Sequence, residues 1–303
     1  MTEPASASRT DLVVAVVQRA AAQAWSDDTA VASNTAAIAA AYHDVADTAD
    51  LVVFPELAVT GYIPLKGYDQ SRKQILAAAA AEATGTSLPR LVAATAGRRA
   101  LMAVGLMEPT SMRNEFFNSV ALIEAGEIVA VYRKVHLPVE ENHYFTPGDR
   151  VAVADTRLGR VGLMICYDML FPELARDASL RGAELLVVAA NWLDLGNLER
   201  LGEVLPVARA LEGQCHVVFA NGVGEMEVRG RNWSLYGKSR IVSALGEVIA
   251  TAGPGAETLV ATLPGAHLDH ASDIFPVLRD RRPELYGHLV RPHADFAALS
   301  DGS

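Results

Sequence analysis

Short apolar runs recur along the whole chain and are separated by polar or alanine-rich segments. Most of these runs are continuous rather than alternating, which is typical of strands that are buried on both faces or lie inside a sandwich. We therefore predict strands over ten segments: 12–18, 51–56, 101–107, 119–126, 127–134, 160–168, 184–192, 216–223, 239–246 and 258–263.

Alanine-rich segments between several of these runs have the composition of helices. We predict helices over 29–46, 71–83, 171–181 and 198–212. The alternation of strands and helices indicates an α/β fold. A short turn at 125–127 joins two apolar runs and predicts a β-hairpin, and the segment 244–247 predicts a second hairpin turn. Because hairpins interrupt the alternation, we expect mixed sheets rather than a doubly wound parallel sheet.

Composition narrows the classes of protein that fit this pattern. The chain has 303 residues, of which half are hydrophobic, so it can bury a large core and disorder is not expected. Its formal charge of −10 argues against nucleic-acid binding, which requires a basic surface. We predict a single domain over 1–303, with a disordered tail over 1–10 and a C-terminal arm over 265–303.

Cysteine usage and the absence of targeting signals indicate the compartment. The first ten residues lack the basic and apolar regions of a signal peptide, and the apolar runs are too short to span a bilayer, so we expect a soluble cytoplasmic protein. Only Cys166 and Cys215 are present, which excludes a disulfide framework. His267 and His270 lack a patterned third ligand, so we expect no metal site.

Cys166 is the first candidate for chemistry. It ends a strongly apolar run and precedes a helix that Pro172 would begin, so a nucleophile here would be held by a sheet. A buried structural thiol fits the same position equally well. Since a free thiol needs a base or a cation to become reactive, its partners decide between the two interpretations.

Three charged residues are possible partners for this thiol. Glu56 follows an apolar run, where burial would make its carboxylate a better proton acceptor, although a solvated strand-end glutamate is an equal alternative. Lys134 ends another apolar run and has the charge to stabilise a thiolate or an oxyanion, although such a lysine alone usually lies on the surface. Glu141 lies seven residues later and says little alone.

Taken together, these residues lie in a set of motifs that resembles a known family. Pro-Glu-Leu at 55–57, Tyr-Arg-Lys-Val-His-Leu-Pro at 132–138, Glu-x-x-Tyr-Phe-x-Pro-Gly at 141–148 and Ile-Cys-Tyr-Asp-x-x-Phe-Pro-Glu at 165–173 resemble the nitrilase superfamily of carbon–nitrogen hydrolases, in its amidase-like branch. The resemblance extends from about Leu12 to Leu289. It implies a four-layer αββα sandwich of two mixed sheets with helices on the outside.

The resemblance also implies roles for these residues. Cys166 would be the nucleophile that forms a thioester, Glu56 the general base, and Lys134 the partner of the oxyanion together with the backbone N–H of Tyr167. Glu141 would orient Lys134 or the hydrolytic water. No metal or organic cofactor is implied.

Motif position further suggests three residues that bind substrate. They are Tyr62, Asn191 and Trp192, and for Trp192 packing in the core is an equal alternative. Cys215 precedes an apolar run and is most simply a core residue.

The reaction implied is hydrolysis of a non-peptide carbon–nitrogen bond in a small carboxamide, giving a carboxylic acid and ammonia. Carbamoyl-amino-acid hydrolases of the family carry arginines where this chain has Met169 and Leu170, so the clamp for a substrate carboxylate is missing. We therefore expect a neutral or cationic amide with an apolar portion.

Several alternatives stay open at this point. They are an N-carbamoyl amine or amino-acid amidohydrolase, a nitrilase, a soluble acyltransferase and a non-catalytic scaffold. The family resemblance also implies a homodimer or larger homo-oligomer that pairs through the helix at 171–181 and the C-terminal arm.

Overall fold

The computed structural model describes residues 9–63, 70–194, 196, 199–228 and 230–291. Most of the tail predicted over 1–10, and the end of the predicted arm from 292, therefore lie outside the described residues. Within the described part of the chain, no helix is both long and apolar enough to cross a membrane.

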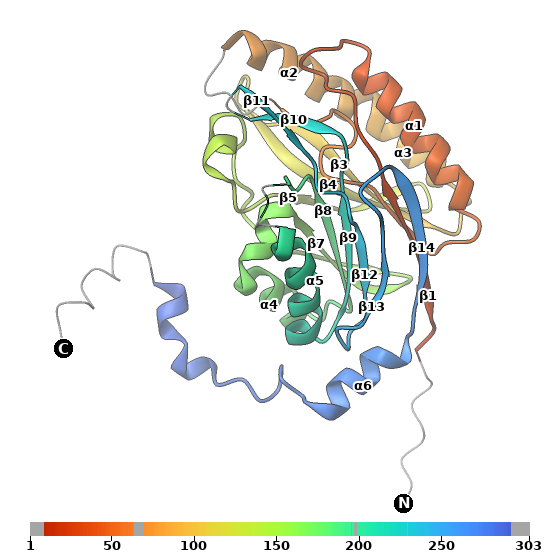
Figure 1. The fold of residues 1–303 in the computed structure, drawn as a ribbon, viewed down its shortest axis with the longest axis vertical. Helices are drawn as coiled ribbons and strands as arrows, with labels where there is room; N and C mark the ends of the chain where they lie inside the picture. The colour runs from red at the N-terminus through yellow and green to blue at the C-terminus, as the bar shows by residue number, and fades with distance from the viewer. Residues whose placement is uncertain (1–8, 64–69, 195, 197–198, 229, 292–303) are drawn as a thin grey trace, which may run out of the picture.

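Two six-stranded mixed sheets form the centre of the fold (Figure 1). The parallel strands of the first sheet are β1–β3, and those of the second are β7–β9. In order across the first sheet, the strands are β14 (Glu257–Leu263), β1 (Leu12–Gln18), β2 (Leu51–Val53), β3 (Leu101–Pro109), β4 (Phe116–Glu124) and β5 (Glu127–Arg133). In order across the second, they are β13 (Val248–Thr251), β12 (Arg240–Val242), β9 (His216–Asn221), β8 (Leu185–Ala190), β7 (Gly159–Ile165) and β6 (Ala152–Thr156).

Helices cover the outer faces of both sheets. The first sheet carries α1 (Ala30–Val45), α2 (Gln70–Glu82), the single π-helical turn η1 (Ala83–Ser87) and α3 (Leu88–Thr95), and the second carries α4 (Pro172–Leu180) and α5 (Glu199–Gly213). A small hairpin of β10 (Glu225–Val228) and β11 (Arg231–Ser234) lies beside the strand ends. The predicted four-layer αββα sandwich is therefore confirmed.

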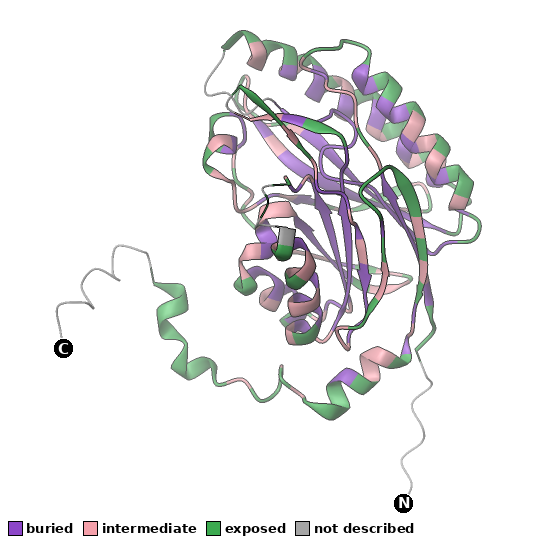
Figure 2. Cartoon of the chain, in the orientation of Figure 1, coloured by how far each residue is buried: buried purple, intermediate pink, exposed green. Residues whose placement is uncertain are grey.

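Beyond the last strand, the chain leaves the sandwich. The helix α6 (Ala266–Ile274) and two short 3-10 helices, η4 (Pro283–Leu285) and η5 (Gly287–Val290), follow one another along an extended arm (Figure 1). Most of this arm is exposed, whereas the central strands of the two sheets, such as β2, β3, β8 and β9, are almost entirely buried (Figure 2).

The apolar runs fill two layers of core. One layer lies between the sheets and extends to α4 and α5, and it includes Val187, Val218 and Cys215, as predicted for that cysteine. The other lies between the first sheet and α1, with Ile38 and Tyr42 among its residues. Continuous apolar strands are thus explained, because both faces of the central strands pack against apolar neighbours.

Differences from the predicted elements occur mainly at strand ends and in less apolar segments. Strand β2 stops at Val53 rather than 56, since the chain turns there and Leu57 takes a left-handed φ of 49°. Strand β7 ends at Ile165 instead of 168, because Cys166 begins a 3-10 turn. The pattern missed β6, β10, β11, α3 and α6, whereas β4 with β5 and β12 with β13 form the hairpins predicted at 125–127 and 244–247.

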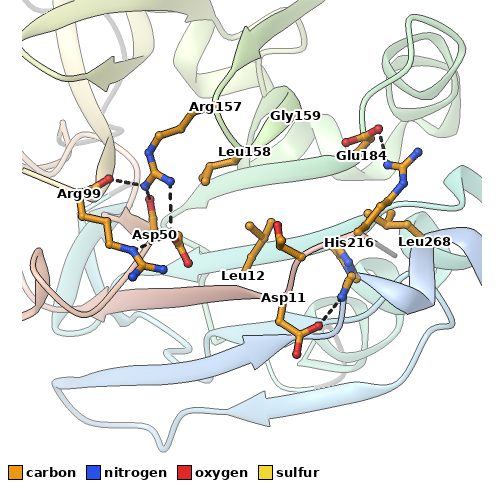
Figure 3. Close-up of a pocket in the computed structure, with 13 residues that line it drawn as sticks. Asp11, Leu12, Asp50, Arg99, Arg157, Leu158, Gly159, Glu184, His216 and Leu268 are labelled. Carbon is orange, nitrogen blue, oxygen red and sulfur yellow. Dashed lines mark hydrogen bonds and ion pairs between the residues drawn. The ribbon is translucent and has the colours of Figure 1, made fainter. Parts of the chain in front are cut away.

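A network of charged residues ties the two sheets together at the amino end of β2 (Figure 3). Asp50 accepts hydrogen bonds from Nε of Arg99 at 2.9 Å, from the N–H of Val13 at 3.0 Å and from Nη1 of Arg157 at 3.3 Å. Burial alone would raise the pKa of Asp50, but these donors hold it below its usual value. Because Arg157 belongs to the β6–β7 turn, the network joins the second sheet to the first.

Candidate functional site

The candidate residues lie at the opposite end of the sandwich, where the parallel strands finish. Glu56 follows β2 and Lys134 follows β5 in the first sheet, while Cys166 follows β7 and Asn191 follows β8 in the second. Glu141 comes from η2 (Val139–His143), a short 3-10 helix after β5. The two sheets therefore supply different parts of one site.

Close packing against β3 fixes the segment that carries Glu56. The N–H of Phe54 donates to Ala103 at 2.9 Å, and the N–H of Val59 donates to Gly105 at 3.1 Å. A Cβ atom at Gly105 would lie only 2.4 Å from the carbonyl oxygen of Pro55. This approach requires glycine at position 105.

The turn that presents Cys166 is strained. Cys166 has a φ of 47°, in the left-handed region that residues with a side chain rarely adopt. Cys166 is the first residue of the 3-10 turn η3 (Cys166–Leu170). Pro172 then lies in the first turn of α4, as predicted. Such strain persists only where surrounding contacts hold it, and it is common at functional sites.

Three buried charged side chains form one hydrogen-bonded cluster. Nζ of Lys134 lies 2.8 Å from Oε1 of Glu56 and 2.8 and 2.9 Å from the two carboxylate oxygens of Glu141. The Tyr62 hydroxyl donates a short hydrogen bond to Glu141, and the N–H of Asn191 donates to Oε2 of Glu56 at 2.9 Å. Since these charged side chains are withdrawn from solvent, their mutual pairing is what makes the burial tolerable.

Electrostatics within the cluster set its protonation states. Burial alone would lower the pKa of Lys134, but Glu141, Glu56 and Cys166 raise it well above its ordinary value, so the ammonium form is retained. Burial raises the pKa of Glu141, and Glu56 adds to this effect while Lys134 opposes it. Burial and Glu56 also raise the pKa of the Cys166 thiol, despite the opposing charge of Lys134. The resting cysteine is therefore a thiol, and a base must remove its proton.

Cys166 opens into a cavity of about 220 Å³. Among the described residues that line this cavity, Glu141 is the one with a carboxyl group, and that group is already bonded to Lys134. The lining is otherwise aromatic, aliphatic or amide in character: Tyr62, Pro138, Tyr167, Leu170, Asn191, Trp192, Leu193, Leu201 and Met226.

The predicted binding residues all reach this cavity, but two of them also support the cluster. Tyr62 is bonded to Glu141, and the side-chain amide of Asn191 donates to the backbone carbonyl of Glu56 at 2.6 Å. Trp192 is mostly buried and lies edge-on to Phe219, so it belongs to both the cavity wall and the core. Of Met169 and Leu170, which stand where carbamoyl-amino-acid hydrolases of the family carry arginines, Leu170 lines the cavity.

Sequence reasoning missed three polar residues that support the site. Asn118 donates to Oε1 of Glu56 at 2.7 Å, and Asp168 and Tyr132 bond to each other behind Cys166 at 2.7 Å. A polar Asn-Ser pair inside the apolar run of β4 was the available signal for Asn118. Among the described residues, no group of three or more histidine, cysteine or acidic side chains is arranged to hold a metal ion.

Comparison with known proteins gives a consistent result. The family model for carbon–nitrogen hydrolases matches residues 13–270. The chain is 32% identical to a probable nitrilase of Schizosaccharomyces pombe over 80% of this chain and 86% of that protein. It is 34% identical to an (R)-stereoselective amidase of Pseudomonas sp. over 81% of this chain and 84% of that protein.

A solved structure has the same fold. It is a variant of the amidase from Nesterenkonia sp. AN1, described as showing covalent addition of the acetamide moiety of fluoroacetamide at the active site cysteine. The two chains superpose with a TM-score of 0.74 at 28% identity, over 91% of this chain and 95% of the amidase. With its family match, these relatives and this fold, the chain belongs to the carbon–nitrogen hydrolases of the nitrilase superfamily and is an amidase-like enzyme that acts on carbon–nitrogen bonds.

Proposed function

We propose that the protein hydrolyses a small neutral or cationic carboxamide to a carboxylic acid and ammonia through a thioester on Cys166. The observation that carries this proposal is the buried, hydrogen-bonded cluster of Glu56, Lys134 and Glu141, which shares the wall of a largely apolar cavity with the Cys166 thiol. The covalent adduct on the active site cysteine of the Nesterenkonia amidase supports the same role for a cysteine here.

In the first half of the reaction, Glu56 accepts the thiol proton as the sulfur attacks the amide carbon. The carbonyl oxygen gains negative charge, which the Lys134 ammonium and the N–H of Tyr167 stabilise. The protonated Glu56 then gives its proton to the departing nitrogen, so ammonia leaves and the thioester remains.

The second half repeats these steps with water in place of the thiol. Glu56 takes a proton from the water as it attacks the thioester carbon, and the same donors stabilise the oxyanion. Collapse of the intermediate breaks the carbon–sulfur bond, and the proton returns to the sulfur. Glu141 keeps Lys134 in place, since both of its carboxylate oxygens lie within hydrogen-bond distance of Nζ.

The cavity supports a substrate without a carboxylate next to the amide. No arginine or lysine is among the described residues that line it, and several of the lining residues are aliphatic or aromatic. A volume of about 220 Å³ admits only a small acyl group. An amide with a short alkyl or aryl acyl portion therefore fits best.

Ammonia release from a panel of small amides, N-carbamoyl compounds and nitriles tests the reaction. We expect turnover of alkyl or aryl amides that Cys166→Ala abolishes and Cys215→Ala retains, with an acyl mass on Cys166 in single-turnover experiments. Preference for nitriles, carbamoyl compounds or α-carboxyl amides would contradict the proposed substrate class. Added hydroxylamine distinguishes a transferase, because it would then become the main acceptor.

We also propose that the chain forms a homodimer or larger assembly through its C-terminal arm. The arm runs away from the sandwich (Figure 1) and exposes large apolar side chains, with Phe275 71%, Leu289 61% and Val290 87% exposed. Contact with another copy would remove this apolar surface from water. Sedimentation equilibrium should give a dimer or larger species, and Phe275→Glu with Leu289→Glu should shift it toward monomer; a monomeric parent protein would contradict the proposal.

A further inference from the structure

One more buried acid touches both segments that carry the reacting groups. Asp168 is fully buried and lies two residues after Cys166. Its Oδ2 accepts the N–H of Ile165 at 3.0 Å and the hydroxyl of Tyr132 at 2.7 Å. Its Oδ1 accepts the backbone N–H of His136 at 3.0 Å and lies 2.9 Å from Nδ1 of the same residue.

The spacing of these partners is informative. Tyr132 and His136 lie two residues before and two residues after Lys134, so the carboxylate holds the chain on both sides of the lysine. Its bond to Ile165 holds the residue directly before Cys166. A single side chain thus joins the end of β5 in the first sheet to the end of β7 in the second.

Other contacts make this junction stiff. The His136 ring stacks on Phe171 with centroids 3.7 Å apart and an interplanar angle of 6°, which ties the residue after η3 to the same segment. From the other side, the buried guanidinium of Arg209 donates to the carbonyl of Met169 at 2.7 and 3.0 Å. The strained φ of Cys166 is therefore held between two sets of hydrogen bonds.

We propose that Asp168 is a positioning residue that fixes the Cys166 sulfur relative to the Lys134 ammonium. The inference rests on the roles of Cys166 and Lys134 in the proposed function. Asp168 does not line the cavity as described, so it acts through its bonds to the two segments and not through substrate. Displacement of reacting groups by about 1 Å can cost on the order of a hundredfold in rate, so such a junction matters for turnover.

Asp168→Asn in the full chain tests this role. The amide has one acceptor oxygen and one donor nitrogen in place of two acceptor oxygens, so it cannot accept from the N–H of His136 and from the Tyr132–Ile165 pair at the same time. The readout is the rate of Cys166 alkylation by iodoacetamide between about pH 6 and pH 10, followed by mass spectrometry without substrate. Glu56, Glu141 and Lys134 are the charged groups that act on this thiol.

We expect the alkylation curve of Asp168→Asn to move to higher pH, because the thiolate is less well stabilised when the Lys134 ammonium is displaced. With a turned-over amide, kcat should fall between about tenfold and a hundredfold while KM changes little. Tyr132→Phe removes one of the four bonds and should shift the curve less in the same direction. This second variant keeps the test valid if Asp168→Asn does not fold.

Asp50→Asn is the matched control. It makes the same chemical change in another buried carboxylate that binds a backbone N–H and two side chains, at the other end of the sandwich (Figure 3). It should lower the melting temperature without moving the alkylation curve. If Asp168→Asn and Tyr132→Phe behave in the same way as Asp50→Asn, Asp168 is only structural and the proposal is wrong.

The two proposals fail in distinguishable ways. Alkylation needs no substrate, so a shifted curve in a protein that hydrolyses no amide would contradict the proposed function and leave the positioning role in place. Hydrolysis with an unshifted curve would contradict the positioning role alone.

Discussion

The side-chain amide of Asn118 donates a 2.7 Å hydrogen bond to Oε1 of Glu56, the same oxygen that Lys134 contacts. Asn118→Ala removes this donor from a buried carboxylate. Hydrogen bonds to charged groups are worth about 1.5–3 kcal/mol, so we expect kcat to fall on the order of tenfold or more with little change in KM. Steady-state kinetics on a hydrolysed amide measure this.

Ser119 provides the control for that substitution. It is the next residue of β4, points to the other face and bonds to Glu108 at 3.0 Å. Ser119→Ala should keep kcat, and an Asn118→Ala variant with unchanged kcat would show that Glu56 does not depend on this donor.

Gly105→Ala should disturb Glu56 through the backbone. The new Cβ would lie 2.4 Å from the Pro55 oxygen and 2.5 Å from the Leu57 nitrogen, so the segment between them must move. We expect a lower melting temperature and a fall in kcat of about tenfold or more per folded molecule. Gly85→Ala, where a Cβ meets nothing within 4 Å, should retain both properties. Equal behaviour of the two variants would contradict the prediction.

Met226 is expected to limit the length of the acyl group. It comes from β10, is almost fully buried and lines the cavity beside Cys166. Met226→Ala enlarges that wall, so the ratio of kcat/KM for a longer over a shorter acyl amide should rise about tenfold, as one methylene is worth about 1–3 kcal/mol. The neighbouring exposed Glu225→Ala should leave this ratio unchanged. The prediction is wrong if both variants keep the parent preference.

His216 should make stability depend on pH in the acidic range. Burial, with His267 and Arg9, lowers the pKa of His216 from 6.5 to about 4. Its Nδ1 accepts the N–H of Ala244 at 3.0 Å, which fits the neutral ring. In the unfolded chain, His216 is protonated below about pH 6.5, whereas in the folded chain it is protonated only below about pH 4. The free energy of unfolding therefore decreases as the pH is lowered through this range.

Urea denaturation at several pH values measures that loss. The difference between the two pKa values of His216 corresponds to a loss of about 3 kcal/mol in the free energy of unfolding of the parent protein. The variant His216→Asn keeps an acceptor but cannot titrate, so its free energy of unfolding should fall less over the same pH range. Parallel curves for the two proteins would show that His216 is not responsible.

The apolar pattern predicted the strands that are buried on both faces, such as β8 and β9, because their sequences are apolar throughout. It missed β10 and β11, whose residues are mostly polar. Pairing with a neighbouring strand stabilises these segments, and a local pattern does not contain that partner.

The site divides in the same way. Glu56, Lys134, Glu141 and Cys166 were predicted from motifs that surround them in the sequence. The structure places Lys134 within hydrogen-bond distance of Glu56 and Glu141, and Cys166 lines the same cavity as Glu141, while their catalytic roles stay predictions. Asn118 and Asp168 were not predicted as site residues, although Asp168 lies inside one of the motifs. These two residues matter because of the residues that they contact once the strands have paired and the sheets have packed. Such contacts between distant parts of the chain are not visible in a local sequence pattern.

Since Glu56 and Lys134 follow strands of one sheet and Cys166 and Asn191 follow strands of the other, the complete arrangement exists only when both sheets are packed together. A chain with one sheet folded has either the base or the thiol, never the pair. Activity should therefore disappear together with the packing between the sheets during unfolding, and a reactive cysteine is not presented by a half-folded chain. The architecture thereby restricts the chemistry to the finished protein.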